Sequence, residues 1–383
     1  MTKPTEQLLK VKLGEFTLQR LPKRPLELLQ AWDAADEYLL DTVAETLPAL
    51  TEPGILIVND SFGALAVALS ALQPLAFSDS YLSQQATRLN LTENGLSLQQ
   101  VQLINSLEPL QGLFDIVLIK APKTLALLED QLIRIRPHLN PNSQVILAGM
   151  IKALPSALWT MLERLIGPTT TSLARKKSRL ITATVDQHIP LSNNPYPVCY
   201  TLENTNYLIS NHANVFSRER LDIGTRFFLE HLPIKPAFRD IIDLGCGNGL
   251  LGLMAAERNP LATLHFVDES FMAVASAKDN FCRAFGLTRS AIFTAGDGLC
   301  DTEASSADLI LCNPPFHQQH TVGDQIAVSL FVQSRRVLRK GGELWVIGNR
   351  HLNYHNQLQR LFGNHQVIAA NAKFIIIKAT VKS

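Results

Sequence analysis

The chain has 383 residues, enough for two domains of ordinary size, and 46% of them are hydrophobic, so a large core can form. Its net charge of +1 provides no overall attraction to nucleic acid, so any RNA contact must come from local patches. No apolar run reaches the ~20 residues of a membrane span, the N-terminus lacks a signal-peptide core, and the five cysteines show no metal-site spacing. We therefore expect a reduced, cytoplasmic protein without a metal site.

Segments typical of strands and helices alternate along the chain, and the same order of segments occurs twice. The paired segments are 55–63 with 242–249, 77–79 with 266–268, 114–119 with 307–312, 144–149 with 343–348, and 179–185 with 375–381. In this pairing Gly63 matches Gly249, and Asp79 matches Asp268. Two unrelated α/β domains could share part of the pattern by chance, but matches in the same order throughout favour duplication.

Each half is predicted to be an α/β domain with a mostly parallel sheet and helices on both faces. The last two strand-like runs of each half are separated by a short turn, which indicates an antiparallel pair at the end of the sheet. The proline-rich segment 190–197 is incompatible with a helix and is the predicted linker. The domains are therefore expected at 1–189 and 198–383.

The first half lacks the residues on which the chemistry of the second half is predicted to depend. Asn59 and Ser61 stand where the second half has Gly245 and Gly247, and their Cβ atoms would crowd a ligand on the turn. Cations are prominent instead, namely Lys120, Lys123, Arg175, Lys176, Lys177 and Arg179. Such residues neutralise phosphate groups, so this half is expected to hold RNA; a scaffold with solvated lysines is the alternative.

The second half contains an apolar strand, a turn with Gly245, Gly247 and Gly249, and a helix-like segment. This arrangement lets a nucleotide-like ligand approach the backbone and the free N–H groups at the helix start. Leu250 stands where a dinucleotide fingerprint has its third glycine, which argues against NAD. We expect the turn, including Asn248, to bind a cofactor.

Three acidic residues accompany the predicted strands of this half. Asp243 can balance the positive charge of a sulfonium, or it can brace the turn through backbone N–H groups. Asp268 ends the second strand, where a carboxylate can accept both hydrogen bonds of a ribose diol, although it can also cap the next helix. Asp297 ends the third strand and can accept a hydrogen bond from an adenine amino group.

The residues Asn313, Pro314, Pro315 and Phe316 follow a buried strand-like run and are the expected catalytic residues. A base amine is a poor nucleophile because its lone pair is delocalised into the ring. The carbonyl groups of Asn313 and Pro314 can each accept one N–H and turn the lone pair toward a methyl group. The prolines stiffen the turn, and Phe316 offers a face on which the base can stack. With the glycine turn, these residues predict an S-adenosylmethionine-dependent methyltransferase acting on an amino nitrogen, with both motifs in one cleft.

Further residues near the motifs are assigned from their positions. Phe216 is expected to contact the cofactor, Ser217 to cap the helix that follows it, and Arg350 to contact phosphate. His317 and His320 have the spacing of a metal-ligand pair, but no third ligand is evident. A loop contact to substrate or solvent is the interpretation that we favour for them.

The chain resembles the bacterial ribosomal RNA guanine-N2 methyltransferases called RsmC and RlmG over nearly its whole length. The resemblance rests on residues 214–217 (NVFS), 243–249 (DLGCGNG), 313–317 (NPPFH) and 348–352 (GNRHL), and the longer tract after Asn313 is closer to the RlmG branch. It implies two tandem Rossmann-like methyltransferase domains with mostly parallel seven-stranded sheets, the N-terminal copy being degenerate. It also implies methyl transfer from S-adenosylmethionine to N2 of one guanine in 23S ribosomal RNA. Asn214 departs from the RsmC branch, where glycine is expected.

Other functions stay open at this point. The resemblance implies motif roles for Gly245, Gly247, Asp268, Asp297 and Asn313 in either branch, so a 16S RNA methyltransferase is an alternative. Protein glutamine methyltransferases also use an Asn-Pro-Pro turn, usually followed by tyrosine, but they carry a short helical N-terminal domain. A non-catalytic assembly factor is the remaining alternative, and the intact motif residues argue against it.

Overall fold

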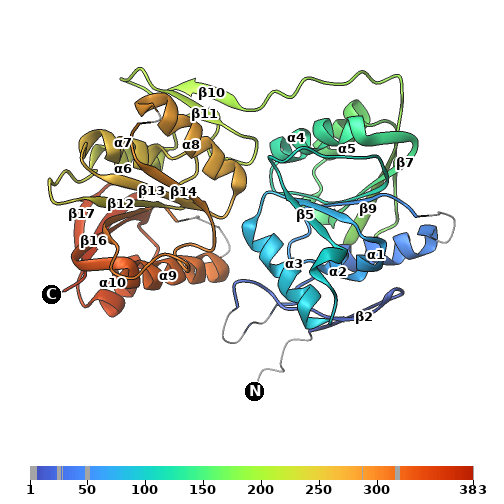
Figure 1. Ribbon diagram of the computed structural model, residues 1–383, viewed down its shortest axis with the longest axis horizontal. Coiled ribbons are helices and arrows are strands. Elements are labelled where there is room, and N and C mark those ends of the chain that lie inside the picture. Colours follow the sequence, from blue (N-terminus) through green and yellow to red (C-terminus); the bar gives the residue numbers. More distant parts are fainter. Residues whose placement is uncertain are drawn as a thin grey trace. The chain divides into compact units, whose positions relative to one another are not determined.

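The computed structural model describes residues 7–23, 27, 29–47, 52–286, 288–314 and 320–382, with the backbone alone for 320–324. The chain divides into two compact units, residues 1–196 and 197–383, each of which is described by itself (Figure 1). The division falls at the carboxyl end of the predicted linker. Just before it, Asn194 donates to Asp130 Oδ1 at 2.7 Å and the Tyr196 hydroxyl donates to Glu129 Oε2 at 3.1 Å. Part of the predicted linker is therefore bound to the first unit.

The first unit contains a hairpin, a seven-stranded sheet and surrounding helices. The strands are β1 (Leu8–Val11), β2 (Gly14–Thr17), β3 (Ile55–Val58), β4 (Leu75–Ser78), β5 (Gln102–Asn105), β6 (Phe114–Lys120), β7 (Leu139–Met150), β8 (Thr169–Thr171) and β9 (Ser178–Thr184). The helices are α1 (Ala34–Thr46), α2 (Ala64–Ala68), α3 (Tyr81–Glu93), α4 (Leu125–Ile135) and α5 (Ala157–Leu165). The sheet has the order β5-β4-β3-β6-β7-β9-β8, and β9 is antiparallel to both of its neighbours.

The second unit has the same architecture. Its strands are β10 (Val198–Thr201), β11 (Leu208–Asn211), β12 (Asp240–Leu244), β13 (Thr263–Asp268), β14 (Ala291–Ala295), β15 (Ala307–Cys312), β16 (Leu338–Asn349), β17 (Gln366–Ala370) and β18 (Phe374–Thr380). Its helices are α6 (Ile223–Glu230), α7 (Leu250–Arg258), α8 (Phe271–Phe285), α9 (His320–Val337) and α10 (Tyr354–Phe362). The sheet order β14-β13-β12-β15-β16-β18-β17 repeats that of the first unit. The predicted fold, with an antiparallel pair at the end of each parallel sheet, is confirmed.

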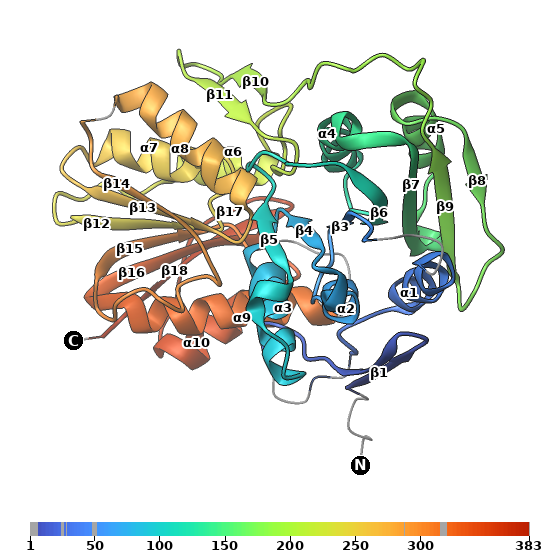
Figure 2. The same cartoon turned by 45° about the vertical axis from the view of Figure 1, so that its right-hand side comes forward.

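Helices cover both faces of each sheet because the central strands are apolar on both sides (Figure 2). In β3, Leu56 and Val58 pack into a core with α4 and α5, whereas Ile55 and Ile57 pack into a core with α1, α2 and α3. The second unit likewise has one core with α7 and α8 and another with α9 and α10. This layering leaves the carboxyl ends of the parallel strands as the edge from which polar side chains can reach a ligand.

The two units also repeat each other in local contacts. The buried Asn90 on α3 donates to the Phe62 carbonyl at 2.7 Å, and the buried Asn280 on α8 donates to the Asn248 carbonyl at 3.0 Å. Both carbonyls lie in the turn that follows the first central strand. The same asparagine side chains also bond the segment that carries the N-terminal hairpin of each unit. In both units, the turn is thus held by an asparagine on the corresponding helix, α3 or α8.

The predicted pairing of the two halves is wrong by one residue at the second strand. Ser80 caps α3 and Ser270 caps α8, each accepting from the backbone of the third helical residue. Ser80 N donates to Ser78 Oγ at 3.2 Å, and Ser270 N donates to Asp268 Oδ1 at 3.0 Å. Ser78 therefore stands where Asp268 does, and Asp79 lies one residue further on. The strand register, not the shared aspartate, sets the correspondence, so the first unit lacks this carboxylate.

Candidate active site

The glycine turn joins β12 to α7. Its first two N–H groups, from Gly245 and Cys246, donate to the Val267 carbonyl at 2.8 and 3.0 Å. Gly247 has φ +53°, and apart from its two chain neighbours no described residue has an atom within 4 Å of the position that a Cβ would take there. Gly249 has φ +77°, and its Cβ would lie 2.7 Å from Cβ of Ala277. Gly247 therefore borders open space that suits a ligand, whereas Gly249 serves the close packing of α7 against α8.

Two acidic residues lie beside this turn at the ends of neighbouring strands. Asp268 Oδ2 accepts a hydrogen bond from Gly247 N at 2.9 Å, which brings the carboxylate to the turn. Gly296 N donates to the Asp268 carbonyl at 2.9 Å, so the adjacent Asp297 lies at the same edge. Burial raises the pKa of Asp297 above its ordinary value. The two carboxyl groups and the turn together offer acceptors and an open backbone to a nucleoside.

Asp243 lies under the turn and is 1% exposed. Its Oδ2 accepts from Gly252 N in the first turn of α7 at 2.7 Å, and its Oδ1 is buried without a partner among the described residues. Burial, and secondarily the charge of Asp268, raises the pKa of Asp243 to about 8. Asp243 thus bonds the start of α7, and both of its predicted roles, bracing the turn and balancing the charge of a sulfonium, stay predictions.

Asn248 has its side chain turned toward the N-terminal hairpin of the unit. Its Nδ2 donates to Asn211 Oδ1 at 2.9 Å, and its Oδ1 accepts from Leu250 N at 3.3 Å. These contacts hold the turn in place from outside. Phe216, which follows β11 along the chain, has a side chain that is 69% exposed. Its contact with a cofactor stays a prediction.

Asn313 directly follows β15, whose Cys312 pairs with Leu244 of β12. A Cβ at Gly245 would lie 3.9 Å from the Asn313 carbonyl oxygen, so the two motifs meet as predicted from the topology. Asn313 Nδ2 donates to Thr225 Oγ1 at 3.2 Å, while its Oδ1 is buried and has no hydrogen-bond partner in the described part of the chain. Pro314 is buried. Pro315, Phe316 and His317 lie outside the described residues, as does the side chain of His320.

The contact to Thr225 was not predicted. Thr225 is in the first turn of α6, and the residue that caps this helix is Asp222, whose carboxylate accepts from Thr225 N at 2.9 Å. The expected cap, Ser217, instead donates from Oγ to the Arg220 carbonyl at 2.8 Å. Asp222 precedes a helix with the spacing of a cap, so the sequence carried a signal for it. Nothing in the sequence linked Thr225 to Asn313.

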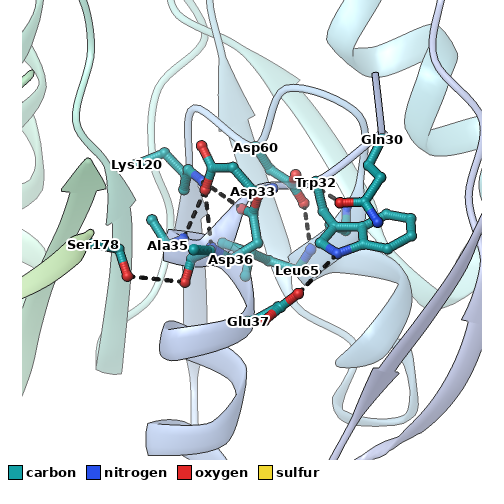
Figure 3. Close-up of polar contacts among 12 residues, drawn as sticks. Gln30, Trp32, Asp33, Ala35, Asp36, Glu37, Asp60, Leu65, Lys120 and Ser178 are labelled. Atoms are coloured by element: carbon teal, nitrogen blue, oxygen red, sulfur yellow. Dashed lines mark hydrogen bonds and ion pairs between the residues drawn. The ribbon is translucent and has the colours of Figure 1, made fainter. Parts of the chain in front are cut away.

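Lys120 takes the place of Asn313 in the first unit, because Ile119 pairs with Val58 as Cys312 pairs with Leu244. Its ammonium group lies 2.6 Å from Asp33 Oδ1 and 2.8 Å from Asp36 Oδ1, and the side chain is 12% exposed (Figure 3). Burial raises the pKa of Asp36, and the neighbouring ammonium group of Lys120 opposes that rise. A lysine held in this way is not presented to RNA, which argues against its predicted role.

The turn after β3, which corresponds to the glycine turn of the second unit, is held by hydrogen bonds of its own side chains. Asp60 is 4% exposed, and its carboxylate accepts from the backbone N–H groups of residues 63, 64, 65 and 66 at 2.9–3.0 Å. Asn59 keeps the left-handed backbone of Gly245, with φ +63°, and its carboxamide bonds Gln131. The N–H groups at the start of α2 are therefore satisfied by Asp60.

The other predicted RNA contacts of the first unit differ in their surroundings. Arg175 pairs with Asp41 at 2.6 Å and Lys176 with Glu37 at 2.5 Å, so acids on α1 neutralise both. Lys123 and Lys177 are exposed, and no ion pair is found for either among the residues described. Nε of Arg179 is buried without a partner in the same part of the chain.

Arg350, the predicted phosphate contact of the second unit, donates from one guanidinium nitrogen to the Asn371 carbonyl at 3.3 Å. Among the described residues, no cluster of histidine, cysteine, aspartate or glutamate could hold a metal ion. Within those residues, too, no helix is long and apolar enough to span a membrane.

Comparison with known proteins covers both units. Residues 6–187 match the family model described as the RLMG N-terminal domain, and residues 206–378 match the model described as the methyltransferase small domain. The solved structure titled T. thermophilus 16S rRNA N2 G1207 methyltransferase (RsmC) in complex with AdoMet and guanosine aligns with a TM-score of 0.76. It covers 98% of this chain and is itself covered to 97%, at 21% sequence identity, so it supports the tandem fold.

Relatives of much higher identity carry one shared name. Ribosomal RNA large subunit methyltransferase G of Stutzerimonas stutzeri is 51% identical over 96% of this chain and 97% of the relative. The protein of the same name from Pseudomonas putida is 50% identical over 97% of this chain and 99% of the relative. The chain therefore belongs to the family of the ribosomal RNA large subunit methyltransferases G.

Proposed function

We propose that this protein transfers a methyl group from S-adenosylmethionine to the exocyclic N2 amine of a guanine in 23S ribosomal RNA. The observation that carries the proposal is that Oδ1 of Asn313, on a residue that lies against the glycine turn, is buried and has no hydrogen-bond partner in the described part of the chain. A buried acceptor without a donor is costly unless a ligand supplies one. The two N–H groups of a base amine are such donors.

The residues around the turn fit the proposed cofactor. Gly245 and Gly247 would lie along it, Asp268 would accept from its ribose hydroxyls, and Asp297 would accept from its adenine amino group. When bound, S-adenosylmethionine supplies an electrophilic methyl group on a sulfonium. The open space at Gly247 and the carboxylate 2.9 Å from its N–H support this assignment.

The chain's own residues would act on the amine by accepting its hydrogen bonds. Asn313 Oδ1 and the Pro314 carbonyl each take one N–H, which draws the amine out of conjugation and stabilises positive charge as it develops on nitrogen. Phe316 would stack on the base, a contact worth roughly 1–3 kcal/mol. No side chain is needed as a strong base, because the methylated amine loses its proton readily to water.

The first unit would hold the RNA through surface cations, with residues 198–383 as the catalytic domain, 1–189 as the RNA-binding domain and 190–197 as the linker. Lys123 and Lys177 are exposed and are the stronger candidates for phosphate contacts. Arg179 and Arg350 remain candidates on position alone. Lys120, Arg175 and Lys176 already face carboxylates and would contribute less. Action on ribosomal RNA would place the protein in the cytoplasm.

A direct test incubates the protein with methyl-tritiated S-adenosylmethionine and unmodified transcripts of 23S or 16S RNA. We expect label in 23S RNA, released on digestion as N2-methylguanosine. Label in 16S RNA alone would favour the small-subunit alternative, and label in a protein glutamine would favour the other enzymatic alternative. Absence of label in every substrate, with cofactor binding intact, would favour a non-catalytic assembly factor.

A further inference from the structure

The hydroxyl group of Thr225 lies between two side chains of the second unit. Its Oγ1 is 3.4 Å from Asp222 Oδ2, to which it can donate, and it accepts from Asn313 Nδ2 at 3.2 Å. An ionised carboxylate can only accept hydrogen bonds, so the single hydroxyl proton is directed to Asp222. The lone pairs of Thr225 are then directed to Asn313.

This chain of contacts determines which end of the Asn313 carboxamide is left without a partner among the described residues. The two ends of a carboxamide have nearly the same shape, so only hydrogen bonding decides between its two orientations. An acceptor at Thr225 requires the NH₂ end of Asn313 there. The oxygen is then the end that remains without a partner, as Oδ1 does among the described residues.

The first unit shows the same contact with different chemistry. Asp33 caps α1 and accepts from Asp36 N, as Asp222 caps α6 and accepts from Thr225 N. Asp36 then contacts Lys120, the counterpart of Asn313, at 2.8 Å. Both members of the contact differ between the units, yet the contact itself persists. In each unit, the third residue of the helix (α1 or α6) therefore holds the residue at the carboxyl end of the corresponding strand (β6 or β15).

We infer that Thr225, oriented by Asp222, is a positioning residue that directs Oδ1 of Asn313 toward the substrate amine. The inference rests on the proposed function, because it assumes that Asn313 accepts from the amine. Without the hydroxyl, the carboxamide can turn its NH₂ end toward the amine. Two donors would then face each other, and the population of productive complexes would fall.

The test compares Thr225→Val, which keeps the shape and removes the hydroxyl, with Thr225→Ser, which keeps the hydroxyl. Single-turnover methylation of an unmodified 23S RNA transcript is measured at saturating S-adenosylmethionine. We expect Thr225→Val to lower the rate about tenfold, equivalent to ~1.4 kcal/mol, with the Kd for the cofactor unchanged. Thr225→Ser should restore most of the rate. Thr205→Val removes a threonine hydroxyl that bonds the Leu202 carbonyl at 2.9 Å in the same unit, and it is the matched control.

The double variant Thr225→Val/Asn313→Ala distinguishes positioning from a merely structural role. If Thr225 acts through Asn313, adding Thr225→Val to Asn313→Ala has no further effect on the rate. An equal loss in both backgrounds, or a wild-type rate for Thr225→Val, would overturn the inference. A wild-type protein that methylates no RNA would instead overturn the proposed function, so the two failures are distinguishable.

Discussion

Replacing Asn313 by alanine removes the acceptor on which the proposed chemistry depends. Its Oδ1 has no hydrogen-bond partner among the described residues, and its Nδ2 bonds only Thr225 there. Alanine keeps the backbone carbonyl that lies near Gly245. The substitution therefore removes the interaction with the amine and the one hydrogen bond to Thr225, and it leaves the backbone in place.

The size of the effect follows from the charge that develops on the amine nitrogen. Removing one preorganised hydrogen-bonding group aimed at developing charge lowers turnover by ~10²–10³, or ~2.7–4 kcal/mol. The folded state loses one neutral hydrogen bond, worth ~1 kcal/mol, and also loses a buried unsatisfied oxygen. We therefore expect stability to change much less than activity.

Single-turnover methylation of an unmodified 23S RNA transcript measures the chemical step, and calorimetry with S-adenosylmethionine measures the Kd. We expect the rate of Asn313→Ala to fall by the factor given above while the Kd changes by less than about threefold. A rate close to that of the wild type would refute the role of Oδ1. A loss of cofactor binding as large as the loss of rate would refute the separation of the two roles.

Three further predictions concern the buried charges and the first unit. The pKa of Asp243 is raised from 3.8 to about 8, so the folded state binds a proton that the unfolded state releases within this window. The free energy of unfolding should therefore fall as pH rises through this window, by up to ~1.4 kcal/mol per pH unit. In urea titrations without cofactor, Asp243→Asn should make the dependence of this free energy on pH less steep. The same pH dependence in the variant and the wild type would contradict the reasoning. Lys120→Met leaves Asp36 buried without its cation and should cost ~3–5 kcal/mol in the same titration, with the Kd for the cofactor unchanged. Calorimetry of the full chain should give one molecule of S-adenosylmethionine per chain, since the first unit has Ser78 in place of Asp268 and Lys120 in place of Asn313; a stoichiometry of two would show that the first unit also binds the cofactor.

The fold could be predicted because strand and helix periodicities repeat in both halves. The error at the second strand has a physical cause. Apolar pattern and a shared aspartate suggested one alignment, but pairing with the neighbouring strand and the serine caps Ser80 and Ser270 set another. A one-residue shift of this kind is not visible in hydrophobicity, because all four residues of β4 are buried.

The candidate site could be predicted where one short stretch carries its own chemistry. The glycine turn, Asp268 and Asn313 are residues of this kind. Thr225 was missed because its partner is 88 residues away in the sequence. The pairing of Lys120 was missed for the same reason, because Asp33 is 87 residues from it. Contacts of this range depend on the arrangement of α1 or α6 over the sheet, which no local pattern reports.

The interior of the first unit offers little to a ligand. Asp60 accepts from the N–H groups at the start of α2, Ser78 stands in place of Asp268, and Lys120, paired with Asp33 and Asp36, stands in place of Asn313. A contribution of this unit to RNA methylation must therefore come from its surface. Binding of RNA by the first unit and chemistry in the second should then be separable by mutation.

Neutralising Lys123 and Lys177 together tests that separation. Removing one lysine that binds a phosphate group should reduce the slope of log Kd for RNA against log salt concentration by ~0.7–0.9. The variant Lys123→Gln/Lys177→Gln should thus bind a 23S RNA transcript more weakly and with less salt dependence, while turnover at saturating RNA stays at the wild-type level. The matched control is Lys10→Gln/Lys12→Gln, which removes two cations of the same unit that already pair with Glu15 and Glu45. Equal effects of the two double variants on Kd and slope would mean that only net charge matters, and the proposed RNA contacts would be wrong.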